Sequence, residues 1–198
     1  MLVQTSVQGR PRDWSSDGRF VVYENLDAKT GYDLWVLPLF GDPSTSSGQG
    51  RKGVPYLNTQ FNEMEGRFSP NGRWIAYHSN EARRNEVYVQ PFPASAGKWQ
   101  ISTDGGYTPK WSRDGKELFY ITADGKFMAV PVNAGATFEA GVPKALFQTI
   151  FVGYPTGGAQ HYAVSADSQR FFLNVPVGEG AASPITVVLN WTAGIRKQ

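Results

Sequence analysis

Residues 68–77 read FSPNGRWIAY, and this stretch decides the fold. An aromatic residue precedes a Ser-x-Asn-Gly turn, a basic residue follows the turn, and a short apolar segment ends in Tyr77. Asn-Gly between apolar segments is the strongest short signal for a β-hairpin, because glycine adopts a positive φ without steric cost. Serine and asparagine side chains can hold such a turn by hydrogen bonding to nearby backbone amides. The stretch therefore predicts two antiparallel strands joined by a tight turn.

The same pattern occurs three more times along the chain. Residues 14–23 read WSSDGRFVVY, residues 111–120 read WSRDGKELFY, and residues 164–173 read VSADSQRFFL, a degenerate copy. The turn residue stands at positions 17, 71, 114 and 167, at intervals of 43 to 54 residues. A period in this range is that of the four-stranded blades of a β-propeller. We interpret Asp17, Asn71 and Asp114 as turn residues rather than catalytic groups.

Further strands are expected after each hairpin. Third strands are predicted at residues 33–38, 86–91, 126–131 and 185–189, and outer strands at residues 55–57, 99–101 and 145–147. The fourth repeat has no outer strand after it. Residues 2–5 resemble the segments that precede other copies of the repeat. We therefore predict that they complete the last blade and close the ring, so that no sheet edge is left unpaired.

The predicted fold is an all-β β-propeller of four four-stranded blades in one domain, residues 1–198. The blades are expected near residues 8–58, 59–102, 103–149, and 150–191 together with 2–7. Residues 80–85 are polar without an apolar stripe and are expected to form a loop. Residues 42–53 are rich in Ser, Gly and Pro and are expected to be an irregular insertion.

The amino-acid composition argues against several classes of protein, among them nucleic-acid-binding, cysteine-dependent and membrane-spanning proteins. The 198 residues are 40% hydrophobic and 14% aromatic, with 22 Gly and 13 Pro, which is typical of a globular all-β protein. A net charge of +2 gives no basic footprint for nucleic acid. The absence of cysteine excludes disulfides, thiolate metal sites and cysteine nucleophiles. No apolar run approaches the roughly 20 residues that span a membrane, and residues 1–4 lack a signal-peptide pattern, so we expect a soluble protein.

Through these repeats the sequence resembles the TolB-type propeller repeat over nearly the whole chain, most closely at residues 68–77. Residues 32–39, 85–93 and 183–191 also resemble the C-terminal half of propellers attached to bacterial serine/threonine kinases. The resemblance implies a propeller used for binding or sensing, usually without catalysis of its own. By analogy it also implies an extracytoplasmic location. It implies no particular ligand and no functional residues.

The sequence departs from this family pattern, because it has no kinase half and four repeats where six or seven blades are usual. Three architectures stay open at this point. The chain is a fragment of a larger propeller, a true four-bladed ring, or half of a ring that a second copy completes in a homodimer. In the last case residues 2–5 would pair across chains.

Motifs for catalysis are weak. Residues 48–53 match the glycine pattern of phosphate-binding loops, but the required strand before and helix after them are not predicted. Residues 95–98 match Ser-x-x-Lys, but they fall in a predicted hairpin turn rather than on a helix. The chain contains neither Gly-x-Ser-x-Gly nor His-Glu-x-x-His. No catalytic residue and no cofactor are therefore assigned, and a binding protein is favoured over an enzyme.

The two histidines form one group of candidate site residues. His78 ends a predicted second strand and His161 opens a predicted innermost strand, so both are expected on the same face of the propeller. Carboxylates expected on this face are those of Glu63, Glu65, Asp27, Glu81 and Asp124. A histidine with carboxylates can bind a metal ion that activates water for ester or lactone hydrolysis. The two histidines lack a metal-ligand spacing, so no metal site is assigned.

Basic and aromatic residues on the predicted innermost strands form a second group. Arg67 and Lys110 occupy equivalent repeat positions, and with Arg12 they can line a channel that attracts anions. Equally, these cations can pair with Asp13 and Glu65. The candidate ligand-binding residues are thus His161, His78, Arg67, Lys110, Tyr107, Glu63 and Arg12.

The predicted function is a non-catalytic binding or scaffold module that recognises a protein, peptide or small ligand at its axial face. One alternative is a metal-assisted ester or lactone hydrolase with its site at the channel mouth. The other is a purely structural fragment whose ring closes by self-association.

Overall fold

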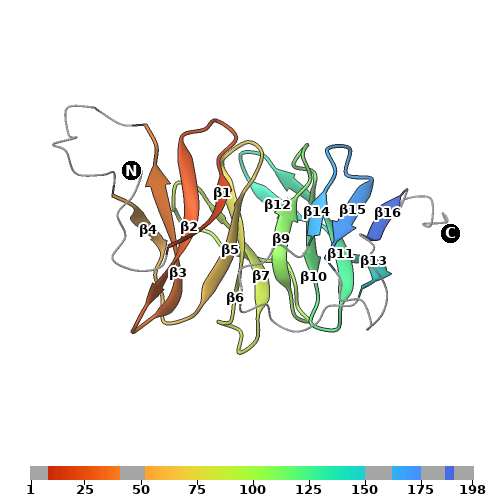
Figure 1. Cartoon of the computed structure of the whole chain (residues 1–198), viewed down its shortest axis with the longest axis horizontal. Coiled ribbons are helices and arrows are strands. Elements are labelled where there is room, and N and C mark those ends of the chain that lie inside the picture. The colour runs from red at the N-terminus through yellow and green to blue at the C-terminus, as the bar shows by residue number, and fades with distance from the viewer. Residues whose placement is uncertain (1–8, 41–51, 150–161, 175–185, 190–198) are drawn as a thin grey trace, which may run out of the picture.

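All strands in the described residues belong to four antiparallel sheets (Figure 1). The computed structural model describes residues 9–40, 52–149, 162–174 and 186–189. The first sheet contains β1 (Arg10–Trp14), β2 (Phe20–Asp27), β3 (Gly31–Pro38) and β4 (Val54–Leu57). The second contains β5 (Glu63–Phe68), β6 (Trp74–Ser79), β7 (Glu86–Pro91) and β8 (Trp99–Gln100). No helix among the described residues is long and apolar enough to cross a membrane.

The third sheet contains β9 (Tyr107–Trp111), β10 (Glu117–Ile121), β11 (Lys126–Ala134), β12 (Phe138–Ala140) and β13 (Lys144–Gln148). The fourth contains β14 (Tyr162–Val164), β15 (Arg170–Leu173) and β16 (Thr186–Leu189). In the first two sheets each strand pairs with the next one along the chain, which is the up-and-down order expected from the repeat. The hairpin predicted from residues 68–77 is formed by β5 and β6.

The sequence did not predict β12. The third strand of this repeat was expected to end at residue 131, but β11 continues to Ala134 and its last residues pair with β12. Val132, Ala134 and Phe138 are all buried in the core between the second and third sheets. The extension therefore forms because alternate residues continue to bury apolar surface.

The turn motif is held as its residue types predict. In the second sheet Ser69 Oγ donates to Asn71 Oδ1 (2.7 Å) and accepts from the Trp74 amide (3.0 Å), while Asn71 Oδ1 also accepts from the Arg73 amide (3.1 Å). Gly72 has a φ of 69°, which only glycine adopts without cost. The same bonds recur in the other three repeats. The interpretation of these residues as turn formers is confirmed.

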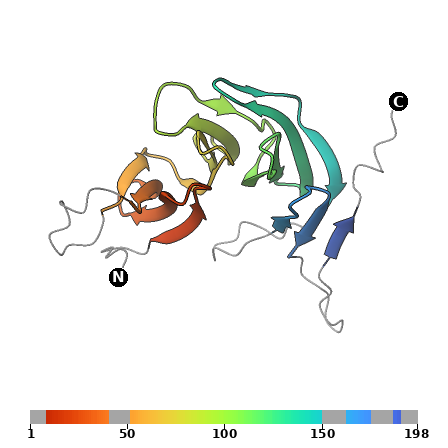
Figure 2. The ribbon, with the colours of Figure 1, turned by 90° about the horizontal axis from the view of Figure 1, so that it is seen from above.

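The sheets follow one another along an open arc, with the first and last sheets at its two ends (Figure 2). Aromatic and aliphatic side chains fill the space between each neighbouring pair of sheets. All residues of β6 are buried, because its sheet is covered on both faces. On β15, by contrast, Phe171 and Leu173 are buried while Arg170 and Phe172 are exposed. Strands of an inner sheet are therefore buried on both faces, whereas strands of the last sheet are buried on one face only.

Ring closure remains a prediction. Residues 2–5, which were expected to complete the last blade, lie outside the described residues. In the part of the chain that the structure describes, no strand pairing joins the last sheet to the first. Residues 80–85 form turns and bends, as expected, whereas most of the insertion expected at residues 42–53 lies outside the described ranges.

Candidate ligand-binding site

The first strands of the first three sheets, β1, β5 and β9, lie next to one another. Each of them has a break in register with its hairpin partner at an equivalent repeat position. At this break Glu65 has a φ of 57° and Thr108 a φ of 51°, values that non-glycine residues rarely adopt. Such bulges redirect side chains and are frequent beside functional sites. The equivalent positions two residues further on are held by Asp13, Arg67 and Lys110.

A buried ion network joins the first and second sheets. Arg12 pairs with Glu24 (2.7 Å) and with Glu65 (2.9 Å), and Arg67 pairs with the other oxygen of Glu65 (2.9 Å). The Glu65 amide donates to Glu24 (2.7 Å), and the Arg67 guanidinium donates to the Arg12 carbonyl. Charges buried in this way are retained because each one has an opposite partner. The two guanidinium groups are therefore fixed by the protein itself.

Asp13 and Lys110 lie beside this network. Asp13 accepts a hydrogen bond from the Phe68 amide (2.9 Å), and burial raises its pKa in spite of the nearby Arg67. The Lys110 ammonium lies 5.2 Å from the centre of the Tyr162 ring, within the range of a cation–π contact. Burial, assisted by the charge of Arg67, lowers the pKa of Lys110 to about 8. Lys110 is thus a cation that a bound anion would stabilise.

A cavity of about 610 Å³ opens where β1, β5 and β9 run into their turns. Its lining consists of Arg12, Asp13, Trp14, Ser16, Arg67, Phe68, Ser69, Pro70, Lys110, Trp111, Ser112 and Arg113. Trp14 is 60% exposed, and every other tryptophan among the described residues is at least half-buried. The site therefore combines clustered positive charge with a large exposed aromatic side chain.

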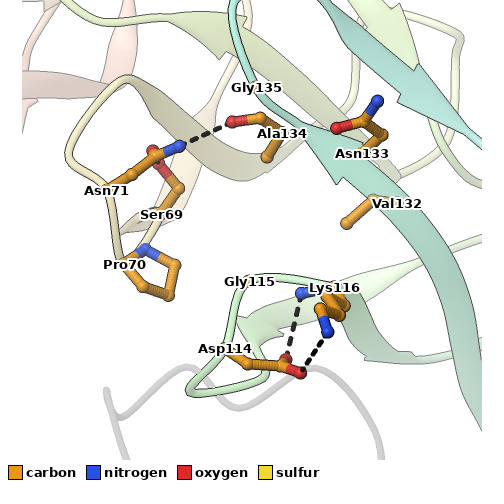
Figure 3. Close-up of a pocket in the computed structure, with 10 residues that line it drawn as sticks. All are labelled: Ser69, Pro70, Asn71, Asp114, Gly115, Lys116, Val132, Asn133, Ala134 and Gly135. Carbon is orange, nitrogen blue, oxygen red and sulfur yellow. Dashed lines mark hydrogen bonds and ion pairs between the residues drawn. The ribbon is translucent and has the colours of Figure 1, made fainter.

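A second cavity, of about 430 Å³, lies between two turns and the end of β11 (Figure 3). There the Asn71 amide donates to the Ala134 carbonyl (2.6 Å) across the opening, and Asp114 accepts from the Lys116 amide (3.1 Å). These groups hold the turns and connect one repeat to the next. This cavity is therefore explained by the packing of turn motifs.

The structure brings together only part of the residues that the sequence singled out. Arg12, Arg67 and Lys110 line the same cavity. His78 and Tyr107 contact each other, with ring centres 5.7 Å apart, but neither lines this cavity. Burial lowers the pKa of His78 to about 3, so its imidazole is neutral. His161 lies outside the described residues.

The carboxylates expected near the histidines serve other contacts. Glu63 is buried and accepts a hydrogen bond from Thr59, and burial raises its pKa to about 7. Asp27 caps a turn, Glu81 pairs with Lys98 (2.6 Å), and Asp124 pairs with Lys126 (2.8 Å). Within the described ranges no group of three or more histidine or acidic side chains is placed to hold a metal ion.

Sequence reasoning missed two features of the site. Glu24 interrupts an apolar strand directly after Tyr23, and this charge among buried residues was the available signal for the ion network. Trp14 and Trp111 stand at the same repeat position, directly before a turn motif. Trp111 does pack against Phe138, whereas Trp14 is exposed, because no sheet of the described residues covers its side of β1.

Comparison with known proteins identifies the fold but not the function. No family model and no curated protein sequence matches the chain. TolB from Acinetobacter baumannii is similar in structure, with a TM-score of 0.62 and 16% identity over 96% of this chain and 43% of TolB. A puromycin-hydrolyzing peptidase from Mycobacterium tuberculosis is also similar, with a TM-score of 0.56 and 21% identity over 83% of this chain and 28% of the peptidase. The chain thus spans less than half of either protein and has a TolB-like β-propeller fold.

Proposed function

We propose that this chain is a non-catalytic binding module that holds a protein, peptide or small ligand at its axial face. The observation that carries the proposal is the cavity at the turn end of β1, β5 and β9. Its volume of about 610 Å³ lies within the usual range of ligand pockets. Three neighbouring strands supply charged residues to it at equivalent repeat positions, and an exposed Trp14 forms part of its wall.

The hydroxyl groups of this cavity favour binding over catalysis. Ser16 donates to the Pro70 carbonyl (2.6 Å), Ser69 to Asn71 (2.7 Å), and Ser112 to Asp114 (2.8 Å). Ser69 and Ser112 each also accept a hydrogen bond from a backbone amide of the same turn, so these hydroxyl groups serve the turn motif. The metal-assisted hydrolase, with a metal held by His161 or His78 and carboxylates, stays an alternative, and no contact among the described residues favours it.

The four sheets, in this proposal, are consecutive blades of a propeller. Three arrangements stay open: the four blades close on themselves, a second copy completes the ring, or the blades form part of a larger propeller. The arrangement decides which surface surrounds the cavity. The resemblance to kinase-linked propellers supports a sensing role outside the cytoplasm. A light-scattering mass of twice 21.8 kDa would indicate a ring shared by two copies, and a mass near 21.8 kDa would exclude such a shared ring.

A fragment library screened by ligand-observed NMR tests the binding proposal. We expect fragments that bind the wild-type chain to lose binding in Trp14→Ala, because the exposed indole is part of the cavity wall. Phe40→Ala, which truncates an exposed aromatic residue that does not line the cavity, is the matched control and should retain binding. Fragments that bind both variants equally well would overturn the proposal, and so would ester or lactone turnover that one substitution abolishes.

A further inference from the structure

We propose that the cavity takes a small organic anion, namely a carboxylate carried on a flat aromatic group. This inference rests on the proposed binding function and names the ligand class of the same site. It follows from the balance of charge around the cavity and from the nature of its two tryptophans.

Cations outnumber carboxylates around the cavity. Four cationic side chains line it, those of Arg12, Arg67, Lys110 and Arg113. Three carboxylates lie in it or directly behind it, those of Asp13, Glu24 and Glu65. Glu24 and Glu65 pair with the guanidinium groups of the two buried arginines, and Asp13 acts electrostatically on Lys110, so the exposed Arg113 leaves the opening with an excess of positive charge. A negative ligand therefore gains from the field that is already present.

The one acidic residue of the lining is poorly suited to hold a cation. Asp13 already accepts the Phe68 amide, and Arg67 and Lys110 both lie close enough to act on it electrostatically. A positively charged ligand beside Asp13 would also be repelled by these two cations. A carboxylate placed beside Lys110 would instead relieve the repulsion between Lys110 and Arg67.

The tryptophans indicate an aromatic group on the ligand. Trp14 and Trp111 both line the cavity, one 60% exposed and the other partly buried against Phe138. The Trp111 indole N–H donates to the Arg67 carbonyl (3.1 Å), which fixes the ring at the edge of the charged group. Indole rings pack well against flat apolar groups. A ligand with a carboxylate at one end and a ring at the other thus matches both halves of the site.

Calorimetry with the matched pair indole-3-acetate and indole-3-acetamide tests this inference. We expect the acid to bind about tenfold or more tightly than the amide, the effect of one charge-assisted hydrogen bond. Lys110→Met should remove this preference, whereas Lys144→Met, at an exposed lysine on β13, should keep it. Thermal unfolding of both variants shows whether the fold is intact. Above pH 8 the preference should decline as Lys110 loses its proton.

Each outcome bears on a different part of the proposal. Equal binding of acid and amide, both lost in Trp14→Ala, would overturn the anion preference and leave the binding function standing. Inorganic phosphate that binds as tightly as indole-3-acetate would overturn the aromatic part. Failure of indole-3-acetate to bind at millimolar concentration would overturn the ligand class, and the fragment screen would then decide the binding function on its own.

Discussion

Buried ionisable groups are accommodated differently at the two ends of the strands: by ion pairs at one end and by pKa shifts towards the neutral form at the other. At the turn end of β5, the side chains of Arg12, Glu24, Glu65 and Arg67 form ion pairs at distances of 2.7 to 2.9 Å. At the other end, burial raises the pKa of Glu63 and lowers that of His78, so both groups are pushed towards their neutral forms. The difference teaches that a charged ligand fits the turn end, where charge is already accommodated.

Among the variants that test this comparison, removal of the Arg12 charge should lower the free energy of unfolding the most. In Arg12→Met the Glu24 carboxylate is left buried without its cation, and such breaks typically cost about 3–5 kcal/mol of unfolding free energy. Urea denaturation measures this loss. Arg19→Met, which breaks the exposed pair with Asp17, is the control and should leave the transition unchanged. A small effect of Arg12→Met would contradict the view that the network maintains its charge by pairing.

At the opposite end, Glu63 should make the stability of the fold depend on pH. The native pKa of Glu63 is about 7 against an ordinary 4.5, so the folded state holds its proton more tightly than the unfolded state. Its contribution to stability is complete below pH 4.5 and is lost as the pH rises through 7, by about 1–3 kcal/mol. Glu63→Gln should abolish this loss in unfolding titrations at successive pH values. A variant with the same pH profile as the wild type would show that Glu63 is ionised when buried.

Trp14 should have the smallest effect on stability. Because its side chain is largely exposed, Trp14→Ala is expected to change the unfolding free energy by no more than about 0.5 kcal/mol. The buried Trp74→Ala should cost about 3–5 kcal/mol. Thermal denaturation of the two variants makes the comparison. A strongly destabilised Trp14→Ala would mean that this indole serves packing rather than ligand binding.

The repeat made most of the fold predictable. Four copies of one turn motif placed the hairpins, because Ser, Asp or Asn, and Gly each have a local hydrogen-bonding or conformational role that does not depend on distant residues. The extension of β11 and its pairing with β12 depend instead on burial against another sheet. The sequence reasoning missed both.

The site was less predictable than the fold. Arg67 and Lys110 were found because they share a repeat position, and Arg12 because it falls on a predicted innermost strand. Glu24 and the exposure of Trp14 were missed, because partner choice and exposure depend on how neighbouring sheets pack. The left-handed conformation of Glu65 was equally invisible, since a glutamate carries no sequence signal for a positive φ.

The central claim is that the cavity at the turn end of β1, β5 and β9 is the ligand site. Indole N–H signals in a nitrogen-15 NMR titration with indole-3-acetate test it most directly, after assignment by single Trp→Phe variants. We expect the signals of Trp14 and Trp111 to move while those of Trp74 and Trp99 stay in place. Binding that leaves Trp14 and Trp111 unmoved would contradict the account.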